Sequence, residues 1–277
     1  MDFICNEQQQ RLWKTYHMEI PYSGLASLDQ NWRQDQVSSP FSRLYYILAG
    51  EGRLLLDGET MPLKAGNVYL LPAGLVYGYD CPHFMEQLFF HINYTYINGI
   101  DLFRECNCVC ERTLSSEELQ QLKQLYLSDQ LSDACLLKAL LLKELSGFLS
   151  DAQIKEADTR NISPLVAHMF YLAQNPVHAK NRVSTLAKRL HVSPSTLNKH
   201  FHQETGMTPG EYIEQLIISR ACSLLLNEEY SIADIAEELG FSDQFYFTKY
   251  FKKQMAITPS EYRKQMFTRY SANSTCT

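Results

Sequence analysis

The carboxyl-terminal part of the chain contains one sequence pattern twice. The first copy reads "VSPSTLNKHFHQETGMTPGEY" from Val192, and the second reads "FSDQFYFTKYFKKQMAITPSEY" from Phe241. A short segment of helical periodicity precedes each copy and ends at a tight turn, so each copy predicts helix, turn and helix, the helix-turn-helix pattern. This duplication restricts the second half of the chain to a compact, all-helical domain.

The second helix of each copy has one apolar stripe and one polar face. Leu197 and Phe201 are four residues apart, as are Phe247 and Phe251, and this spacing predicts a stripe that packs into a core. The opposite face carries amide, hydroxyl and cationic side chains, which can pair with base edges and phosphates in a major groove, although a solvated surface also carries such side chains. Because the arrangement recurs in both copies, we predict these DNA-binding residues: Ser195, Asn198, Lys199, His202, Gln244, Phe245, Thr248, Lys249 and Lys252.

A single long helix is predicted between the two copies, over residues 208–227. At 1.5 Å per residue it would be roughly 30 Å long. Successive major grooves on one side of a duplex are about 34 Å apart, so one monomer would span two of them. A helical repeat array normally needs three or more units, which favours DNA binding.

The amino-terminal part has the pattern of a β domain. Hydrophobic runs broken by glycines cover residues 44–93, and Asp57-Gly58 between two of them predicts a hairpin. Short strands at regular spacing predict a sandwich or barrel, and "LKAGNVYLLPAG" resembles the middle of a cupin jelly roll. The leucine-rich helices predicted over 115–150 have more apolar surface than one helix stripe needs. The surplus would pack against the cup-shaped β domain or against a second subunit.

These patterns predict a multidomain α and β protein. A cupin-like β jelly roll with a helical dimerisation segment comes first, and an all-α domain with two helix-turn-helix units follows. The predicted bounds are 1–150 for effector binding and dimerisation, 151–161 for a linker and 162–277 for DNA binding. Residues 1–160 hold 13 Lys and Arg against 21 Asp and Glu, whereas the remainder holds 12 against 10, so only the second half suits a polyanion.

At the level of whole motifs the chain resembles the AraC/XylS family of bacterial transcription regulators. The resemblance is carried by "LAKRLHVSPSTLNKHFHQETGMTPGEYI" and "ACSLLLNEEYSIADIAEELGFSDQFYFTKYFKKQMAITPSEYR", within residues 163–265, and more weakly by residues 30–95. It implies an effector-responsive regulator, usually dimeric, whose sensor binds a small molecule, often a sugar. By position in the motif, it maps base contacts to Ser195, Asn198, Lys199, Gln244, Phe245, Thr248 and Lys249.

Three residues depart from the family pattern. His191 stands where the turn glycine is usual, which histidine tolerates at some backbone cost. Ile217 stands where an arginine is common in the linking helix, and Phe245 where a small polar residue is common. The last two affect the expected phosphate contacts and base preference rather than the fold.

The cup is predicted to bind an organic effector rather than a metal. Tyr77 and Tyr79 occupy the H-x-H spacing of metal-dependent cupins, and tyrosines do not replace imidazoles for a transition metal. Aromatic rings with a few polar partners suit a sugar or a similar polar ligand, although the same rings can simply fill a small barrel. The effector-binding candidates are Trp32, Arg43, Tyr45, Tyr79 and Phe90.

The cysteines are interpreted as free thiols. The triplet "ECNCVC" (105–110) would direct three thiols to one face of a strand, but no His or Cys pair at zinc spacing follows. The interpretation is therefore buried, small apolar residues, with no metal and no cofactor.

The predicted function is a non-enzymatic transcriptional regulator that is controlled by a small-molecule effector. Its expected partners are double-stranded promoter DNA, the effector, a second copy of the chain and RNA polymerase. No apolar run is long enough for a membrane span, which predicts a cytoplasmic protein. Two alternatives stay open: a cupin-type metal enzyme with a helical appendage, and a protein-interaction module.

Overall fold

The computed structural model describes residues 9, 16–96, 99–104, 106–152, 162–255 and 257–264. These form two compact units, each considered by itself: a β-rich unit containing residues 18–94 and 101–152, and a helical unit containing 162–255 and 257–264. Most of the predicted linker, 153–161, lies outside the described residues. The predicted domain bounds therefore stay a prediction.

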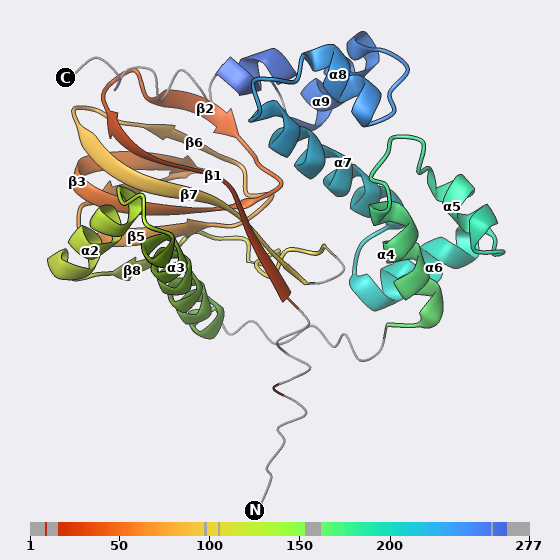
Figure 1. Ribbon diagram of the computed structural model, residues 1–277, viewed down its shortest axis with the longest axis horizontal. Coiled ribbons are helices and arrows are strands. Elements are labelled where there is room, and N and C mark those ends of the chain that lie inside the picture. Colours follow the sequence, from red (N-terminus) through yellow and green to blue (C-terminus); the bar gives the residue numbers. More distant parts are fainter. Residues whose placement is uncertain are drawn as a thin grey trace, which may run out of the picture. The chain divides into compact units, whose positions relative to one another are not determined.

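The β-rich unit is built from eight strands among the described residues, paired mainly in the order β1-β7-β3-β5-β8 (Figure 1). The first half of β3 pairs with β5 and β7, and its second half pairs with β4 and β6, so one long strand serves both walls of a cup. The strands are β1 (Tyr16–Leu28), β2 (Arg33–Val37), β3 (Ser42–Leu56), β4 (Glu59–Lys64), β5 (Asn67–Leu71), β6 (Tyr77–Asp80), β7 (Met85–Tyr96) and β8 (Cys110–Thr113). The β-rich amino-terminal part is therefore confirmed.

The hairpin predicted at Asp57-Gly58 joins β3 to β4. Leu56 pairs with Glu59 immediately across the turn, and Gly58 has a φ of 78°. A positive φ is readily available to glycine because it has no Cβ. The dipeptide thus sets the register of this strand pair.

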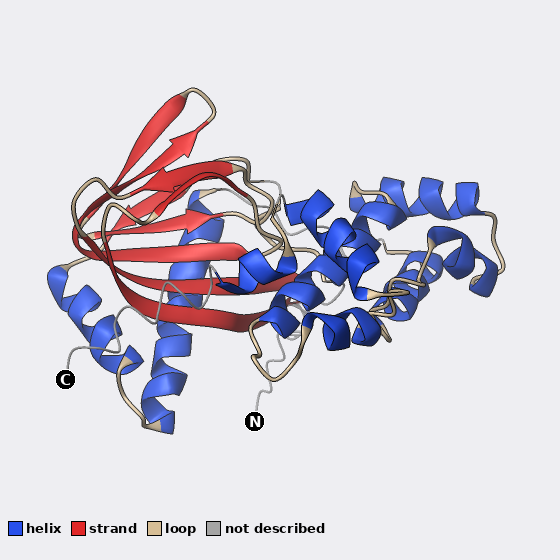
Figure 2. Cartoon of the chain, turned by 90° about the horizontal axis from the view of Figure 1, so that it is seen from above, coloured by secondary structure: helices blue, strands red, loops and turns tan. Residues whose placement is uncertain are grey.

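The two faces of the sheet have different partners. Tyr45 of β3 points into the core of the cup, while its neighbour Tyr46 lies on the other face, edge-on to Phe90 at a centroid distance of 5.9 Å. Phe90 in turn meets the ring of Tyr126 edge-on at 5.9 Å. Tyr126 ends α2 (Ser116–Tyr126), which packs with α3 (Leu131–Asp151) beside the sheet (Figure 2).

The helical unit consists of two helix-turn-helix units joined by α7 (Figure 1). Its helices are α4 (Pro164–Gln174), α5 (Val183–Arg189), α6 (Pro194–Thr205), α7 (Pro209–Leu225), α8 (Ile232–Glu238) and α9 (Gln244–Met255). The connecting helix predicted over 208–227 is thus confirmed with slightly closer ends, since Thr208 caps its start. Its 17 residues are about 25 Å long.

The duplication seen in the sequence is also a duplication of the core. Phe201 of α6 lies 5.5 Å from the ring of Tyr212, and Phe251 of α9 lies 5.6 Å from the ring of Tyr262. All four side chains are buried. The predicted apolar stripes are therefore confirmed, and the "TP-x-EY" ending of each copy supplies the second ring of each pair.

Among the described residues, no helix combines the length and apolar character that crossing a bilayer requires.

Candidate DNA-binding and effector sites

The two helix-turn-helix units turn at equivalent positions with different residues. His191 has a φ of 55°, and Gly240 has a φ of 70°. Val192 donates its backbone N–H to the carbonyl of Ala187, and Phe241 makes the same bond to Ala236. His191 thus adopts a left-handed conformation, so the first copy carries there a strain that glycine avoids.

In the first copy, capping residues position the exposed face of α6. The Ser193 hydroxyl accepts the N–H of Thr196 at 3.1 Å, and Pro194 occupies the first helical turn. Leu197 and Phe201 are buried and fix the rotation of the helix. The four predicted DNA-binding side chains of this copy are all exposed: Ser195, Asn198, Lys199 and His202.

In the second copy, an aspartate takes the capping position. The Asp243 carboxylate accepts the N–H of Tyr246 at 2.8 Å, and this hydrogen bond lowers the pKa of Asp243. Phe247 and Phe251 are buried. The five predicted DNA-binding residues of this copy are exposed except for half-buried Thr248: Gln244, Phe245, Thr248, Lys249 and Lys252.

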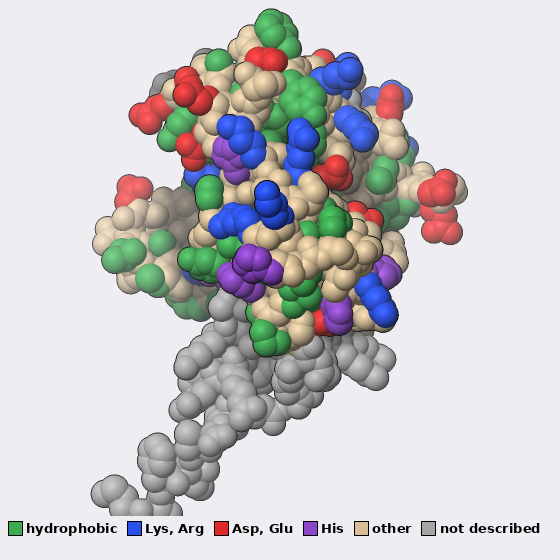
Figure 3. All heavy atoms as spheres, turned by 90° about the vertical axis from the view of Figure 1, so that its right-hand side faces the viewer, with side chains coloured by type: hydrophobic (Ala, Val, Ile, Leu, Met, Phe, Trp, Pro, Cys, Tyr) green, Lys and Arg blue, Asp and Glu red, His purple; other side chains and the backbone are tan. Residues whose placement is uncertain are grey.

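Two large aromatic side chains lie exposed on α9. Phe245 is 76% exposed and Tyr246 is 55% exposed. Tyr246 was not among the predicted site residues. The run "FYF" (245–247) could have indicated it, because three consecutive residues of a helix cannot all face the core. Figure 3 shows the helical unit from one side, where Lys, Arg and His side chains lie among apolar and uncharged ones, with Asp and Glu side chains also present.

The segment between α4 and α5 connects the two copies within the helical unit. Ala179 donates its N–H to the carbonyl of Leu239 at 2.8 Å, beside the second turn. A Cβ built on Gly240 would lie 1.7 Å from a ring carbon of His178, so the imidazole covers this glycine. Glycine is therefore required here for space as well as for its backbone angle.

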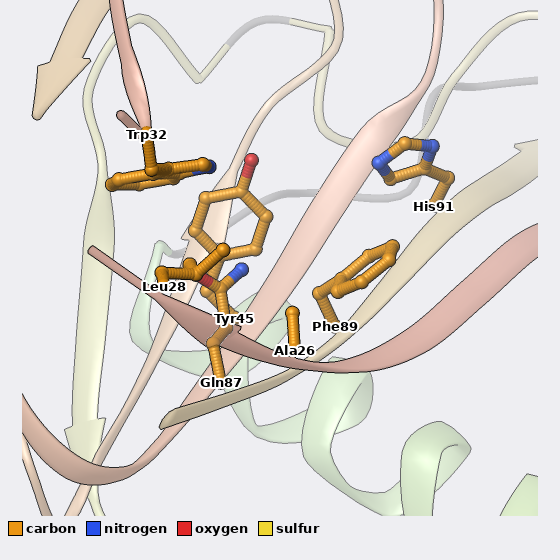
Figure 4. Close-up of a pocket in the computed structure, with 7 residues that line it drawn as sticks. All are labelled: Ala26, Leu28, Trp32, Tyr45, Gln87, Phe89 and His91. Carbon is orange, nitrogen blue, oxygen red and sulfur yellow. The ribbon is translucent and has the colours of Figure 1, made fainter. Parts of the chain in front are cut away.

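The β-rich unit contains a small cavity in the cup (Figure 4). It is lined by Ala26, Leu28, Trp32, Tyr45, Gln87, Phe89 and His91. Its volume is about 10 Å³, roughly enough for one water molecule. An effector of several atoms therefore has to displace packed side chains to bind here.

The predicted effector residues fall into three groups. Trp32 and Tyr45 line the cavity, and Tyr79 stacks on Trp32 at 4.2 Å between ring centroids. Arg43 is buried beside them and donates to the Tyr45 hydroxyl at 3.3 Å. The placement of Phe90 in the cup was wrong, because strand alternation turns it to the face that Tyr126 covers.

The sequence-based prediction missed the cavity residues of β7. Gln87, Phe89 and His91 alternate along the strand and point to one side. Among the described residues, Gln87 Oε1 and His91 Nδ1 are buried and have no hydrogen-bond partner. Burial and the nearby Arg43 charge hold the pKa of His91 well below its usual value, so its ring is neutral at neutral pH. The two-residue alternation of a strand could have identified all three residues, once it was known which face of β7 points into the cup.

Comparisons with known proteins agree with this two-part organisation. Residues 29–145 match the AraC-like ligand binding domain, and residues 186–265 match a helix-turn-helix domain. The chain belongs to the AraC family of transcriptional regulators. It therefore combines a ligand-binding amino-terminal domain with a DNA-binding carboxyl-terminal domain.

Two similar relatives regulate operons, according to their names. The Msm operon regulatory protein of Streptococcus mutans is 27% identical over 261 residues, which are 91% of this chain and 94% of that one. The lactose operon transcription activator of Staphylococcus xylosus is 24% identical over 272 residues, 92% and 96% of the two chains.

A solved structure shows the same fold. The apo form of a lysine-to-alanine variant of ToxT from Vibrio cholerae superposes with a TM-score of 0.57 over 91% of this chain and 98% of that one, at 17% identity.

Proposed function

We propose that this AraC-family chain reads promoter DNA with the exposed faces of α6 and α9. The observation that carries the proposal is that both copies bury the same aromatic pair and expose amide and lysine side chains on the opposite helix face, to which α9 adds two exposed rings. In this proposal Asn198 and Gln244 pair with base edges, and Lys199, Lys249 and Lys252 contact guanine acceptors or phosphates.

We further propose that the effector is a sugar or a sugar-like polar molecule bound in the cup. Trp32 and Tyr45 supply ring faces for C–H surfaces, while Gln87 and His91 supply buried polar atoms for hydroxyl groups. The name of the staphylococcal lactose operon activator agrees with this ligand class. Because the cavity is small, binding has to rearrange the cup, and this rearrangement is the step through which effector and DNA affinity are coupled.

A homodimer is proposed through the helices of the β-rich unit. Leu127, Leu131 and Leu136 are 62%, 79% and 44% exposed at the end of α2 and along α3. Neighbouring exposed leucines are typical of a surface that another chain covers. RNA polymerase stays a predicted further partner.

The DNA-binding proposal is tested by anisotropy titration of the full chain with labelled DNA from upstream of its own gene, at two salt concentrations. We expect affinity to fall steeply with salt, because phosphate contacts release counterions. An Asn198→Ala/Lys199→Ala/Lys249→Ala variant should lose specific binding, whereas Lys64→Ala, an exposed lysine of β4, should not. Absence of duplex affinity at either salt concentration would instead favour the protein-interaction module.

The effector proposal is tested by a thermal-shift screen of the full chain with mono- and disaccharides. A ligand that prefers the native state raises the melting temperature. The shift, and any change in DNA affinity, should disappear in Gln87→Leu and His91→Phe and persist in Val76→Ala, which changes an exposed residue of the same unit. A shift that survives both cavity variants would place the effector elsewhere.

A further inference from the structure

Three cysteines outside both sites lie together at the start of β8. Cys106 Sγ is 4.0 Å from Cys108 Sγ and 3.6 Å from Cys110 Sγ. All three sulfur atoms lie within 4.8 Å of one another. Cys108 is exposed and the other two are half-buried, so the interpretation of the triplet as buried apolar residues was wrong. The loop that leads into β8 brings Cys106 and Cys108 to Cys110, the first residue of that strand.

The sulfur spacing is that of a metal-binding set. Thiolates bind soft ions at about 2.3 Å, and two sulfurs bound to one such ion are then roughly 3.8–4.0 Å apart. Two of the three separations are already close to this value. We propose that Cys106, Cys108 and Cys110 form a three-thiolate site for Cu(I).

Copper(I) fits this donor set better than zinc does. Thiolates select Cu(I) and Zn²⁺ among the common ions, but a structural zinc site is almost always four-coordinate. Among the described residues, no His, Asp or Glu joins the three cysteines to complete a zinc site. Cu(I) is satisfied by three sulfur ligands, and the exposed Cys108 gives the ion a route of entry.

A disulfide is a weaker explanation of the cluster. A disulfide needs a sulfur–sulfur distance of about 2.05 Å. Cys106 Sγ instead lies 3.6 Å from Cys110 Sγ and 4.0 Å from Cys108 Sγ. A bridge would also use only two of the three sulfurs.

The site is directly connected to the frame of the β-rich unit. Val109, between two of the ligands, packs against the core of the cup. Arg112, two residues beyond the last ligand, forms an ion pair with Glu144 of α3 at 3.2 Å. A bound ion would therefore fix the start of β8 between the cup and α3.

The experiment is an anaerobic Cu(I) titration of the reduced, full-length chain against a chromophoric Cu(I) chelator. We expect one equivalent per chain and sulfur-to-copper charge-transfer absorption in the ultraviolet. Cys106→Ser, Cys108→Ser and Cys110→Ser should each weaken retention at least tenfold. Cys135→Ser, which removes another exposed cysteine of the same unit, should leave retention unchanged.

A second measurement separates loss of ligands from loss of fold. Circular dichroism melting of each metal-free variant should match that of the metal-free parent, and X-ray absorption of the loaded parent should show a shell of three sulfurs. The proposal would be overturned if Cys135→Ser lost as much copper as the three ligand variants. It would also be overturned if the parent chain retained Cu(I) no better than a Cys106→Ser/Cys110→Ser variant. Stoichiometric Zn²⁺ binding with weaker Cu(I) retention would overturn the choice of metal.

Discussion

The two helix-turn-helix copies share a core and differ at the turn and on the exposed face. Each buries a phenylalanine against a tyrosine at nearly the same distance, 5.5 Å in the first copy and 5.6 Å in the second. The exposed face of α6 is hydroxyl, amide and cationic, whereas α9 adds an aromatic ring that is 76% exposed. The duplication therefore preserved the packing that orients each helix, while the residues proposed to contact DNA diverged.

The two turns adopt the same left-handed backbone conformation with different residues. His191 keeps its left-handed conformation with an exposed side chain, so its cost is backbone strain. Gly240 has the same conformation, but the His178 ring occupies the space of a Cβ. The first turn thus tolerates a side chain, and the second does not.

Gly240→Ala should produce the largest effect. The substitution adds backbone strain and a clash with His178, which together destabilise the helical unit by about 2–5 kcal/mol. Urea denaturation of the full chain, followed by far-ultraviolet circular dichroism, measures this loss. Trp32 lies in the core of the β-rich unit, so in a Trp13→Phe background tryptophan fluorescence should show that unit unchanged.

A double substitution divides this loss into its two parts. In His178→Ala/Gly240→Ala the ring is absent, so only the backbone strain should remain beyond the cost of His178→Ala alone. Additive losses from the two single variants would show that the imidazole does not restrict this turn, and the proposed difference between the copies would reduce to the backbone.

Lys249→Ala should weaken operator binding by about 1–3 kcal/mol if the lysine contacts a base. Lys199→Ala tests the equivalent face of the first copy, and Lys64→Ala provides a control of equal charge change. Salt titration of each variant separates the roles. A phosphate contact lowers the salt slope and weakens all sequences equally, whereas a base contact alters sequence preference. If both lysines behave like Lys64, neither face carries the binding.

The sequence predicted the helical unit far better than the cavity of the cup. Leu197, Phe201, Phe247 and Phe251 are buried as predicted, because helical spacing and local capping signals determine which face packs. Phe90 was misplaced because two-residue alternation separates two faces without saying which one is inside. That choice depends on Tyr126, which lies far along the chain. The cysteines were misread for a similar reason, since a loop conformation brings Cys106 and Cys108 to Cys110 at the start of β8.

Phe245→Ala tests the main chemical difference between the two faces. If the ring contacts a thymine methyl group, its removal should cost about 1 kcal/mol at sites that carry thymine there. Anisotropy titrations with thymine and with uracil at each candidate position measure this term, because uracil lacks only the methyl group. The variant should no longer distinguish the two bases. Tyr246→Ala, which changes the neighbouring exposed ring, provides the comparison. Equal discrimination in the parent and in Phe245→Ala would remove the ring from base recognition.

His191→Gly should have the smallest effect and the opposite sign. Glycine relieves the left-handed strain at this turn, but it also raises the entropy of the unfolded chain, so the net gain should be about 0.5–1 kcal/mol. His191→Ala removes the imidazole and keeps the strain, and it should not stabilise the protein. Urea denaturation followed by circular dichroism measures both variants. A gain of equal size in His191→Ala would show that the imidazole, rather than the backbone, is unfavourable in the first turn. The two copies would then differ at the turn by side-chain environment alone.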